Sequence, residues 1–150
     1  ASQYAPDEFN AAVSALDRAR QAADARDYRQ ALNDALDSRE RAQEAARQSA
    51  ENMAVARVDA DRAIAAAAAL LTNQRKRVTE LETARVPARA LAEPREQLAA
   101  SETRLQEARA AFDRQDYPAA KAAADAASPA LAPVGHTLEG LWSHAPRRGR

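Results

Sequence analysis

Cysteine is absent from the 150 residues, and glycine and aromatic residues are scarce. Without cysteine the sequence has no disulfide, no thiolate metal ligand and no cysteine nucleophile. Basic and acidic residues balance at 22 each, so no net charge directs the protein towards nucleic acid or an anionic membrane. The longest apolar run, residues 63–71, is shorter than the roughly 20 residues that a membrane-spanning helix needs. We therefore predict no transmembrane segment and no nucleic-acid partner.

Alanine takes the place of the missing residue types and makes up more than a quarter of the chain. Because a buried alanine methyl removes little area from water, we expect a thin core. Alanine also favours the helix more than any other residue. The composition predicts an all-α protein in which small side chains let helices approach closely.

The most distinctive stretch, residues 28–85, contains neither proline nor glycine. We predict that it forms one very long helix. The sequence leaves open whether this helix kinks near residues 49–53 or 72–73. Small and apolar residues recur every seven positions along it, typical of a coiled-coil seam. One row consists of Tyr28, Ala35, Ala42, Ser49, Ala56, Ala63, Leu70 and Ala84, and Arg77 interrupts it. The other consists of Leu32, Ala46, Met53, Ala60, Ala67 and Leu81, and Arg39 and Gln74 interrupt it.

Shorter helices are predicted on both sides of this one. Pro6, followed by two acidic residues, begins a helix that runs to about residue 25, with Phe9, Ala12, Leu16, Ala19 and Ala23 on one face. Val86-Pro87 ends the long helix. A short helical piece at 88–93 and a new helix from Pro94 to about residue 114 follow, with an apolar stripe at Leu91, Leu98, Leu105 and Phe112.

A fourth helix is expected from Pro118 to about Ser128. After it, Pro129, Pro133, Gly135, Gly140 and Pro146 predict a broken segment. We expect residues 129–150 to be irregular and to end in a basic tail. Within them, Val134, Leu138, Leu141 and Trp142 are expected to form one short amphipathic turn that docks on the helices.

The predicted fold is an elongated antiparallel, coiled-coil-like helical bundle over residues 1–128. One long central helix carries two related hairpins, at about 7–50 and 91–128. The first hairpin has only two helices, so we predict that the seam around residues 42–60 is covered by another copy or another protein.

The two hairpin turns match at an offset of 89 residues. Leu16, Ala19-Arg20, Asp24, Asp27-Tyr28, Ala31 and Ala35 correspond to Leu105, Ala108-Arg109, Asp113, Asp116-Tyr117, Ala120 and Ala124. Asp27 and Asp116 are expected to cap the helices that follow. Tyr28 and Tyr117 are expected to pack in the gap between the helices of each hairpin, and stacking on a ligand is the alternative.

The opening residues resemble a family of alanine-rich bacterial envelope proteins known only as a domain of unknown function. The resemblance rests on Tyr4-Ala5-Pro6-x-x-Phe9-x-Ala11-Ala12, on Ala19, and on Asp27-Tyr28-x-x-Ala31-x-x-x-Ala35. It implies a helical hairpin, a periplasmic or cell-envelope location and a lipid anchor upstream of residue 1, but no reaction. Arg26 stands where the family usually has glycine, and neither the lipid-bearing cysteine nor an OmpA-like domain lies within these residues. A weaker resemblance is to tetratricopeptide-like helical hairpins.

Few residues offer catalytic or metal-binding chemistry. His136 and His144 are the only histidines, with Glu139 between them. Two ligands without a clear third make a poor zinc site, so we expect loop histidines rather than a metal or acid–base pair. The glutamates alternate with arginines, as on a solvated helix face. We predict no enzyme, no catalytic residue, no metal and no cofactor.

Two features are candidate partner-binding sites. Arg75, Lys76 and Arg77 form a basic cluster, which either contacts an acidic partner or lipid headgroups or is a solvated helix end. Trp142 either anchors a partner or covers the protein's own core. We expect a non-enzymatic structural or adaptor protein of the bacterial cell envelope, acting through helix–helix contacts. The alternatives are a tetratricopeptide-like peptide-binding module and a reversible amphipathic binder of lipid surfaces.

Overall fold

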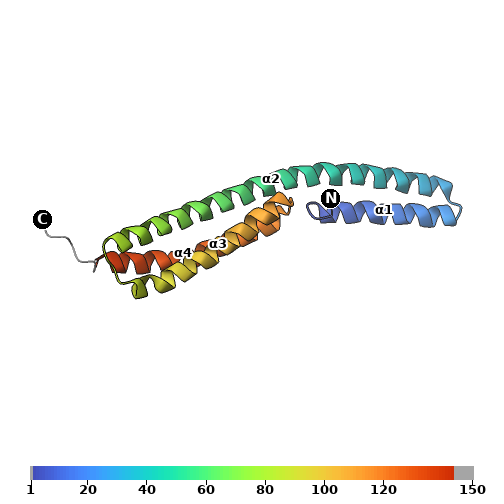
Figure 1. The fold of residues 1–150 in the computed structure, drawn as a ribbon. Coiled ribbons are helices and arrows are strands. Elements are labelled where there is room, and N and C mark those ends of the chain that lie inside the picture. Colours follow the sequence, from blue (N-terminus) through green and yellow to red (C-terminus); the bar gives the residue numbers. More distant parts are fainter. Residues whose placement is uncertain (1, 144–150) are drawn as a thin grey trace. The chain divides into compact units, whose positions relative to one another are not determined.

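The protein is all-α, as predicted, over residues 2–143, which the computed structural model describes. The helices of this part are α1 (Pro6–Asp24), α2 (Tyr28–Thr83), α3 (Ala92–Asp113) and α4 (Tyr117–Ser143), with a short 3-10 helix, η1 (Ala88–Leu91), before α3. The chain divides into two compact units. Unit 1 (Ala1–Ala56) contains α1 and the first part of α2, and unit 2 (Arg57–Arg150) contains the rest of α2 with α3 and α4 (Figure 1).

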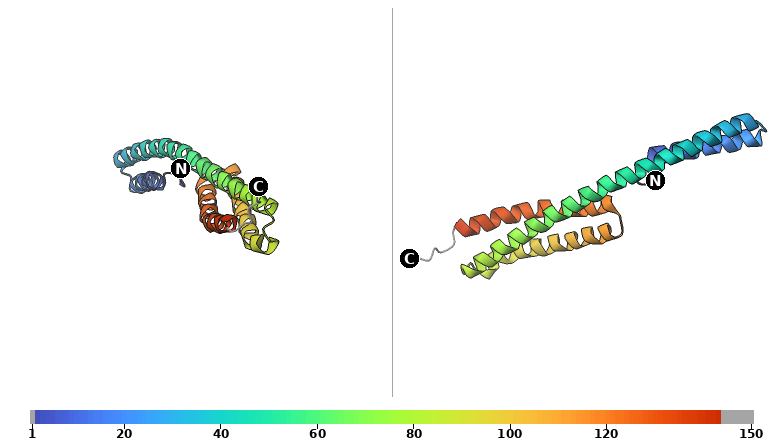
Figure 2. Two further views of the ribbon diagram at one scale, coloured as in Figure 1. Left: turned by 90° about the vertical axis from the view of Figure 1, so that its left-hand side faces the viewer. Right: turned by 90° about the horizontal axis from the view of Figure 1, so that it is seen from above.

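The long central helix is confirmed. α2 is assigned as a single α-helix of 56 residues, and it ends two residues before the predicted end. In unit 1 it lies beside α1, which forms the first hairpin with it, while in unit 2 it lies beside α3 and α4, which form the second hairpin (Figures 1 and 2). Helices of this length depend on tertiary contacts rather than on intrinsic propensity.

Three helices end in the same way, although none has glycine at its end. Arg26, Arg85 and Gln115 adopt left-handed backbone conformations, with φ of 61°, 63° and 64°. In each case the amide of the next residue bonds five residues back, as Asp27 N does to Ala22 O at 2.9 Å and Asp116 N to Ala111 O at 3.0 Å. These are Schellman motifs, in which glycine is the preferred residue. Asp27 and Asp116 then cap the following helices, because their Oδ1 atoms accept from Gln30 N and Ala119 N.

Arg26→Gly is therefore expected to stabilise the protein by about 0.5–1 kcal/mol, because it removes the steric cost of a left-handed non-glycine residue. Gln115→Gly should have a similar effect. Urea denaturation measures both changes. Arg29→Gly, in the first turns of α2, is the control and should instead destabilise by about 1 kcal/mol. A loss of stability in Arg26→Gly would contradict the assigned turn geometry.

The large apolar side chains of the core belong to unit 2. α2, η1, α3 and α4 jointly bury one cluster, which comprises Ala67, Leu71, Val78, Leu81, Leu91, Leu98, Leu105, Ala127, Leu131, Val134 and Leu138. The predicted stripe of Leu91, Leu98 and Leu105 is thus buried. Small residues, including Ala108, Ala120 and Ala124, are fully buried where α3 and α4 form the second hairpin.

The predicted end of the fourth helix at Ser128 is wrong. α4 continues through Pro129 and Pro133 to Ser143, so residues 129–143 are helical and not irregular. Proline removes a backbone bond and strains the helix, but tertiary contacts offset this cost. Leu131, Val134 and Leu138 are buried in the core. Residues 144–150, with His144 and the basic tail, lie outside the described part of the chain.

Polar contacts also support the proline-containing stretch. Arg104 Nη1 of α3 donates to the carbonyl of Ala126, in the turn before Pro129, at 3.0 Å. Thr137 Oγ1 donates to the carbonyl of Pro133 at 3.1 Å. Side chains thus donate to backbone carbonyls beside both prolines.

A polar layer interrupts the core of unit 2. Gln74 and Ser101 are buried, and within the described residues Gln74 Oε1 and Ser101 Oγ have no hydrogen-bond partner. Gly135 faces Gln74 closely, since a Cβ atom at Gly135 would lie 3.0 Å from Gln74 Nε2. The glycine therefore leaves space for the glutamine amide.

Gln74→Leu should raise the free energy of unfolding by about 1–2 kcal/mol, because a side chain of similar size replaces a buried, unpaired acceptor. Chemical denaturation followed by circular dichroism measures the change. The exposed Gln43→Leu change should be neutral. If Gln74→Leu destabilised the protein, the amide would have to make a favourable contact in solution.

Candidate protein-binding surface

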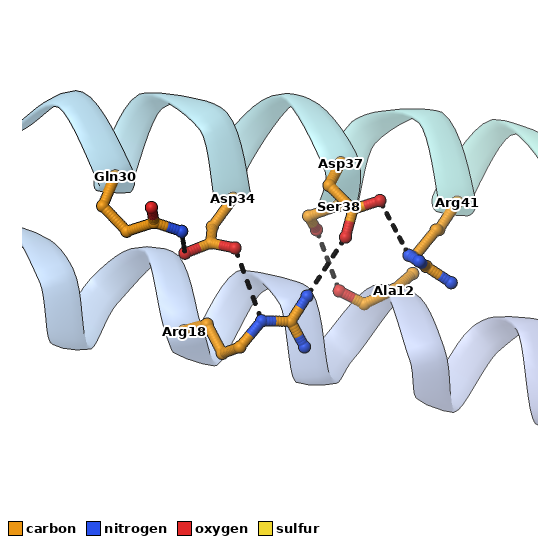
Figure 3. Close-up of polar contacts among 7 residues, drawn as sticks. All are labelled: Ala12, Arg18, Gln30, Asp34, Asp37, Ser38 and Arg41. Atoms are coloured by element: carbon orange, nitrogen blue, oxygen red, sulfur yellow. Dashed lines mark hydrogen bonds and ion pairs between the residues drawn. The ribbon is translucent and has the colours of Figure 1, made fainter.

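The hairpin of unit 1 is held together by alanines and polar groups rather than by large apolar side chains. Ala12, Ala15 and Ala19 of α1 are buried against α2, whose buried positions include Asp34, Ser38 and Ala45. Ser38 Oγ donates to the carbonyl of Ala12 at 2.9 Å (Figure 3). This contact requires close approach of the two backbones, which the small residues permit.

One flank of the hairpin is charged. Arg18 of α1 binds Asp34 Oδ1 at 3.4 Å and Asp37 Oδ2 at 3.1 Å, and Arg41 Nε also donates to Asp37, at 2.9 Å (Figure 3). Gln30 Nε2 donates to the other oxygen of Asp34 at 2.9 Å. The buried carboxylate of Asp34 therefore has two partners.

Further along α2, Arg47 pairs with Glu44 at 2.6 Å and with Glu51 at 2.9 Å. The hydrogen bond from Arg47 lowers the pKa of the Glu44 carboxyl. A lowered carboxyl pKa stabilises the folded state above the ordinary pKa and is lost as the pH falls through the folded value. Because the pair is solvent-exposed, its contribution is small. These ion pairs match the solvated face that the sequence predicted.

The other flank of the hairpin is apolar and exposed. At about 100° per residue, Phe9 and Leu16 lie on the side of the buried α1 ridge opposite to Arg18, and Ala35 and Ala42 lie on the side of the α2 ridge opposite to Asp37. We call this surface the apolar flank; it comprises Phe9, Val13 and Leu16 of α1 and Tyr28, Leu32, Ala35, Ala42, Ala46 and Met53 of α2, all exposed.

This arrangement corrects two expectations. Phe9 and Leu16 do not share the buried face with Ala12 and Ala19, since they are 40% and 39% exposed. Tyr28 does not pack over α1, since it is 70% exposed, whereas Tyr117 is 7% exposed. Tyr117 packs edge-on against Phe112, with ring centroids 5.1 Å apart.

Within unit 1, the residues of the predicted coiled-coil seam of the long helix lie on the apolar flank and do not face α1. Its members Leu32, Ala35, Ala42, Ala46 and Met53 are exposed, while α1 contacts a neighbouring ridge of α2. Both stripes are rich in small residues, so periodicity alone does not show which of them faces α1. Val13 was missed as an apolar surface residue because it lies outside the predicted face.

The basic cluster in unit 2 is paired internally. Arg75 bonds Glu102 of α3, Arg77 Nη1 bonds Glu139 of α4 at 3.0 Å, and Lys76 lies 4.0 Å from Glu80. Arg75 and Arg77 thus link α2 to both other helices of the unit. Each of the three cations has a carboxylate neighbour, which favours a bracing role over capture of an acidic partner.

Arg77 and Trp142 meet at a cavity of about 260 Å³ in unit 2. Its lining comprises Arg77, Glu80 and Leu81 of α2 and Leu138, Glu139, Trp142 and Ser143 of α4. Trp142 is 56% exposed, so it borders the cavity rather than sealing the core. The cavity has room for one side chain or a small apolar group, and the ion pair between Arg77 and Glu139 lies at its rim.

Among residues 2–143, no group of three or more His, Cys, Asp or Glu side chains is placed to hold a metal. His136 is exposed on α4. None of the helices in this part of the chain is both long and apolar enough to cross a membrane. No protein-family model, curated protein or solved structure matches the chain. The apolar flank is therefore the feature on which a functional proposal can be built.

Proposed function

We propose that the protein is a non-enzymatic structural or adaptor protein that acts through helix–helix contacts made by unit 1. The observation that carries this proposal is the apolar flank, where large apolar side chains are exposed beside a hairpin that buries mainly alanine. Contiguous exposed apolar surface of this kind is typical of a protein-interaction site. The cell-envelope location is the part of the proposal that rests on the family resemblance of residues 4–35.

The repeat supports the same proposal. Positions 9, 16, 28, 35 and 42 of unit 1 correspond, at the offset of 89, to Leu98, Leu105, Tyr117, Ala124 and Leu131, all of which are buried. In unit 2 these residues are covered within a three-helix unit that includes Leu71, Val78 and Leu81 of α2. In unit 1 the corresponding flank is exposed. A helix from outside the hairpin would complete it in the same manner.

Site-specific cross-linking in the cells that produce the protein tests the proposal. A photoreactive residue at position 32, on the apolar flank, should cross-link to protein, and the adduct should be lost when Leu16→Glu is added. The same residue at position 55 is the control, because Val55 follows Asp37 by eighteen residues, about five full turns, and so lies on the charged side. Equal labelling from both positions would contradict the proposal.

Cell fractionation tests the location. The full gene product should accumulate in the envelope fraction, and its recovery in the cytoplasm would remove the envelope part of the proposal. Liposome flotation tests the lipid alternative. The flank should bind vesicles poorly, because three of the six residues of its α2 half are alanine, which buries little area in lipid.

A further inference from the structure

The occupant of the apolar flank can be inferred from its shape. On α1 the flank carries large side chains, Phe9, Val13 and Leu16, whereas on α2 its middle part carries the small Ala35, Ala42 and Ala46. A surface with projecting residues on one helix and a shallow strip on the other is complementary to itself. Resting on the proposed function, we propose that the partner is a second copy of this chain, whose unit 1 packs flank to flank with the first.

The register of the hairpin shows how the two copies would pair. Ser38 bonds the carbonyl of Ala12, and Asn52 Nδ2 bonds the carbonyl of Tyr4 at 2.6 Å, so α1 and α2 run antiparallel. The contact of Ser38 with Ala12, together with the turn between Asp24 and Tyr28, places Leu16 about level with Ala35 and Phe9 about level with Ala42. A two-fold axis parallel to the helices lays α1 of each copy over α2 of the other. Leu16 and Phe9 then meet alanines at their own level.

The charges favour this pairing over the other two-fold arrangement. The outer side of α1 bears Asp17 and Asp24, whereas Arg39 interrupts the apolar row of α2 and makes no ion pair within residues 2–143. By the same register Arg39 lies about level with Ala12, so crossing α1 over α2 brings it towards Asp17 of the other copy, five residues further along the helix. Stacking α1 on α1 and α2 on α2 would instead place Arg39 against the other copy's α2, away from these acids. Arg20, which binds Asp17 at 3.3 Å, lies one turn after Leu16, where the apolar flank ends on α1.

The paired units would form a four-helix arrangement in which each hairpin covers the other. Two-fold pairing uses one surface twice and leaves no second flank exposed. It also gives Phe9, Leu16, Ala35 and Ala42 the burial that Leu98, Leu105, Ala124 and Leu131 already have in unit 2. One further layer of helices would thus bury these four positions of the flank.

Sedimentation of the full chain tests whether the pairing occurs. We expect a concentration-dependent dimer, whose dissociation constant rises at least tenfold in Leu16→Glu and changes less than twofold in Val55→Glu. Circular dichroism checks that both variants remain helical. A chain that stays monomeric at high concentration, or a dimer equally sensitive to both changes, would overturn the proposal.

The absence of cysteine allows the orientation to be tested by cross-linking. Chains carrying Leu16→Cys mixed with chains carrying Ala35→Cys should form mixed cross-linked dimers with a short bis-thiol reagent. Leu16→Cys mixed with Glu44→Cys, on the charged side, should not exceed background. Predominant cross-linking of Leu16→Cys to itself would overturn the proposed axis.

The result also separates this inference from the proposed function. If the chain is monomeric but position 32 still cross-links to another protein in cells, self-pairing is wrong and the adaptor proposal stands. If the chain is monomeric and no protein adduct forms, both are wrong.

Discussion

Leu131→Ala is expected to lower the free energy of unfolding by about 2–5 kcal/mol, the range for deleting a large, fully buried apolar side chain. Leu131 is 0% exposed and belongs to the core shared by α2, α3 and α4. Because two prolines flank it at positions 129 and 133, α4 cannot easily shift to fill the cavity. Urea denaturation followed by the fluorescence of Trp142, the only tryptophan, reports on this unit.

Leu36→Ala is the matched control, because Leu36 is exposed in unit 1. It should change stability by no more than about 0.5 kcal/mol. If Leu131→Ala were equally mild, the segment from 129 to 143 would not dock as the helix described above. The sequence expectation of an irregular segment would then be the better account.

The contrast between this segment and α2 shows what local sequence can reveal. The long helix was predictable because residues 28–85 lack proline and glycine, and helix formation there meets no local obstacle. The turns at Asp27 and Asp116 were predictable because capping depends on neighbouring residues. The continuation of α4 was not, because it depends on burial of Leu131 and on a hydrogen bond from Arg104 of α3, neither of which is local.

The candidate surface was predictable only in part. The sequence indicated an alanine-rich seam in need of a partner, but not which stripe of α2 would face α1. In an alanine-rich hairpin, close backbone approach selects the ridge with the smallest residues, so Phe9 and Leu16 are displaced to its side. Tyr28 differs from Tyr117 for a related reason: the position equivalent to Phe112 is Ala23, which provides no ring for it to pack against.

Ala15→Leu is expected to destabilise unit 1 by about 1–3 kcal/mol, the range for adding methylenes to a packed interface. Ala15 is 0% exposed on the buried ridge of α1. A larger side chain there would push α1 away from α2 and weaken the bond between Ser38 and the carbonyl of Ala12. The thermal unfolding of the full chain, followed by circular dichroism, measures the loss.

The control is Ala23→Leu, which makes the same chemical change at an exposed position of the same helix. Ala23→Leu should leave the thermal unfolding of the chain nearly unchanged. If Ala15→Leu were as mild, α1 would not be held against α2 by small residues, and the separation of a buried alanine ridge from an exposed apolar flank would fail.

The assignment of the flank as an interface is tested most directly by hydrogen exchange of the full chain at several concentrations. We predict that amides of α1 and of residues 28–56 exchange faster at low concentration and gain protection as the concentration rises. Amides of α3, α4 and residues 57–83 should show no such dependence. Protection in unit 1 that is independent of concentration, and equal to that of unit 2, would contradict the account.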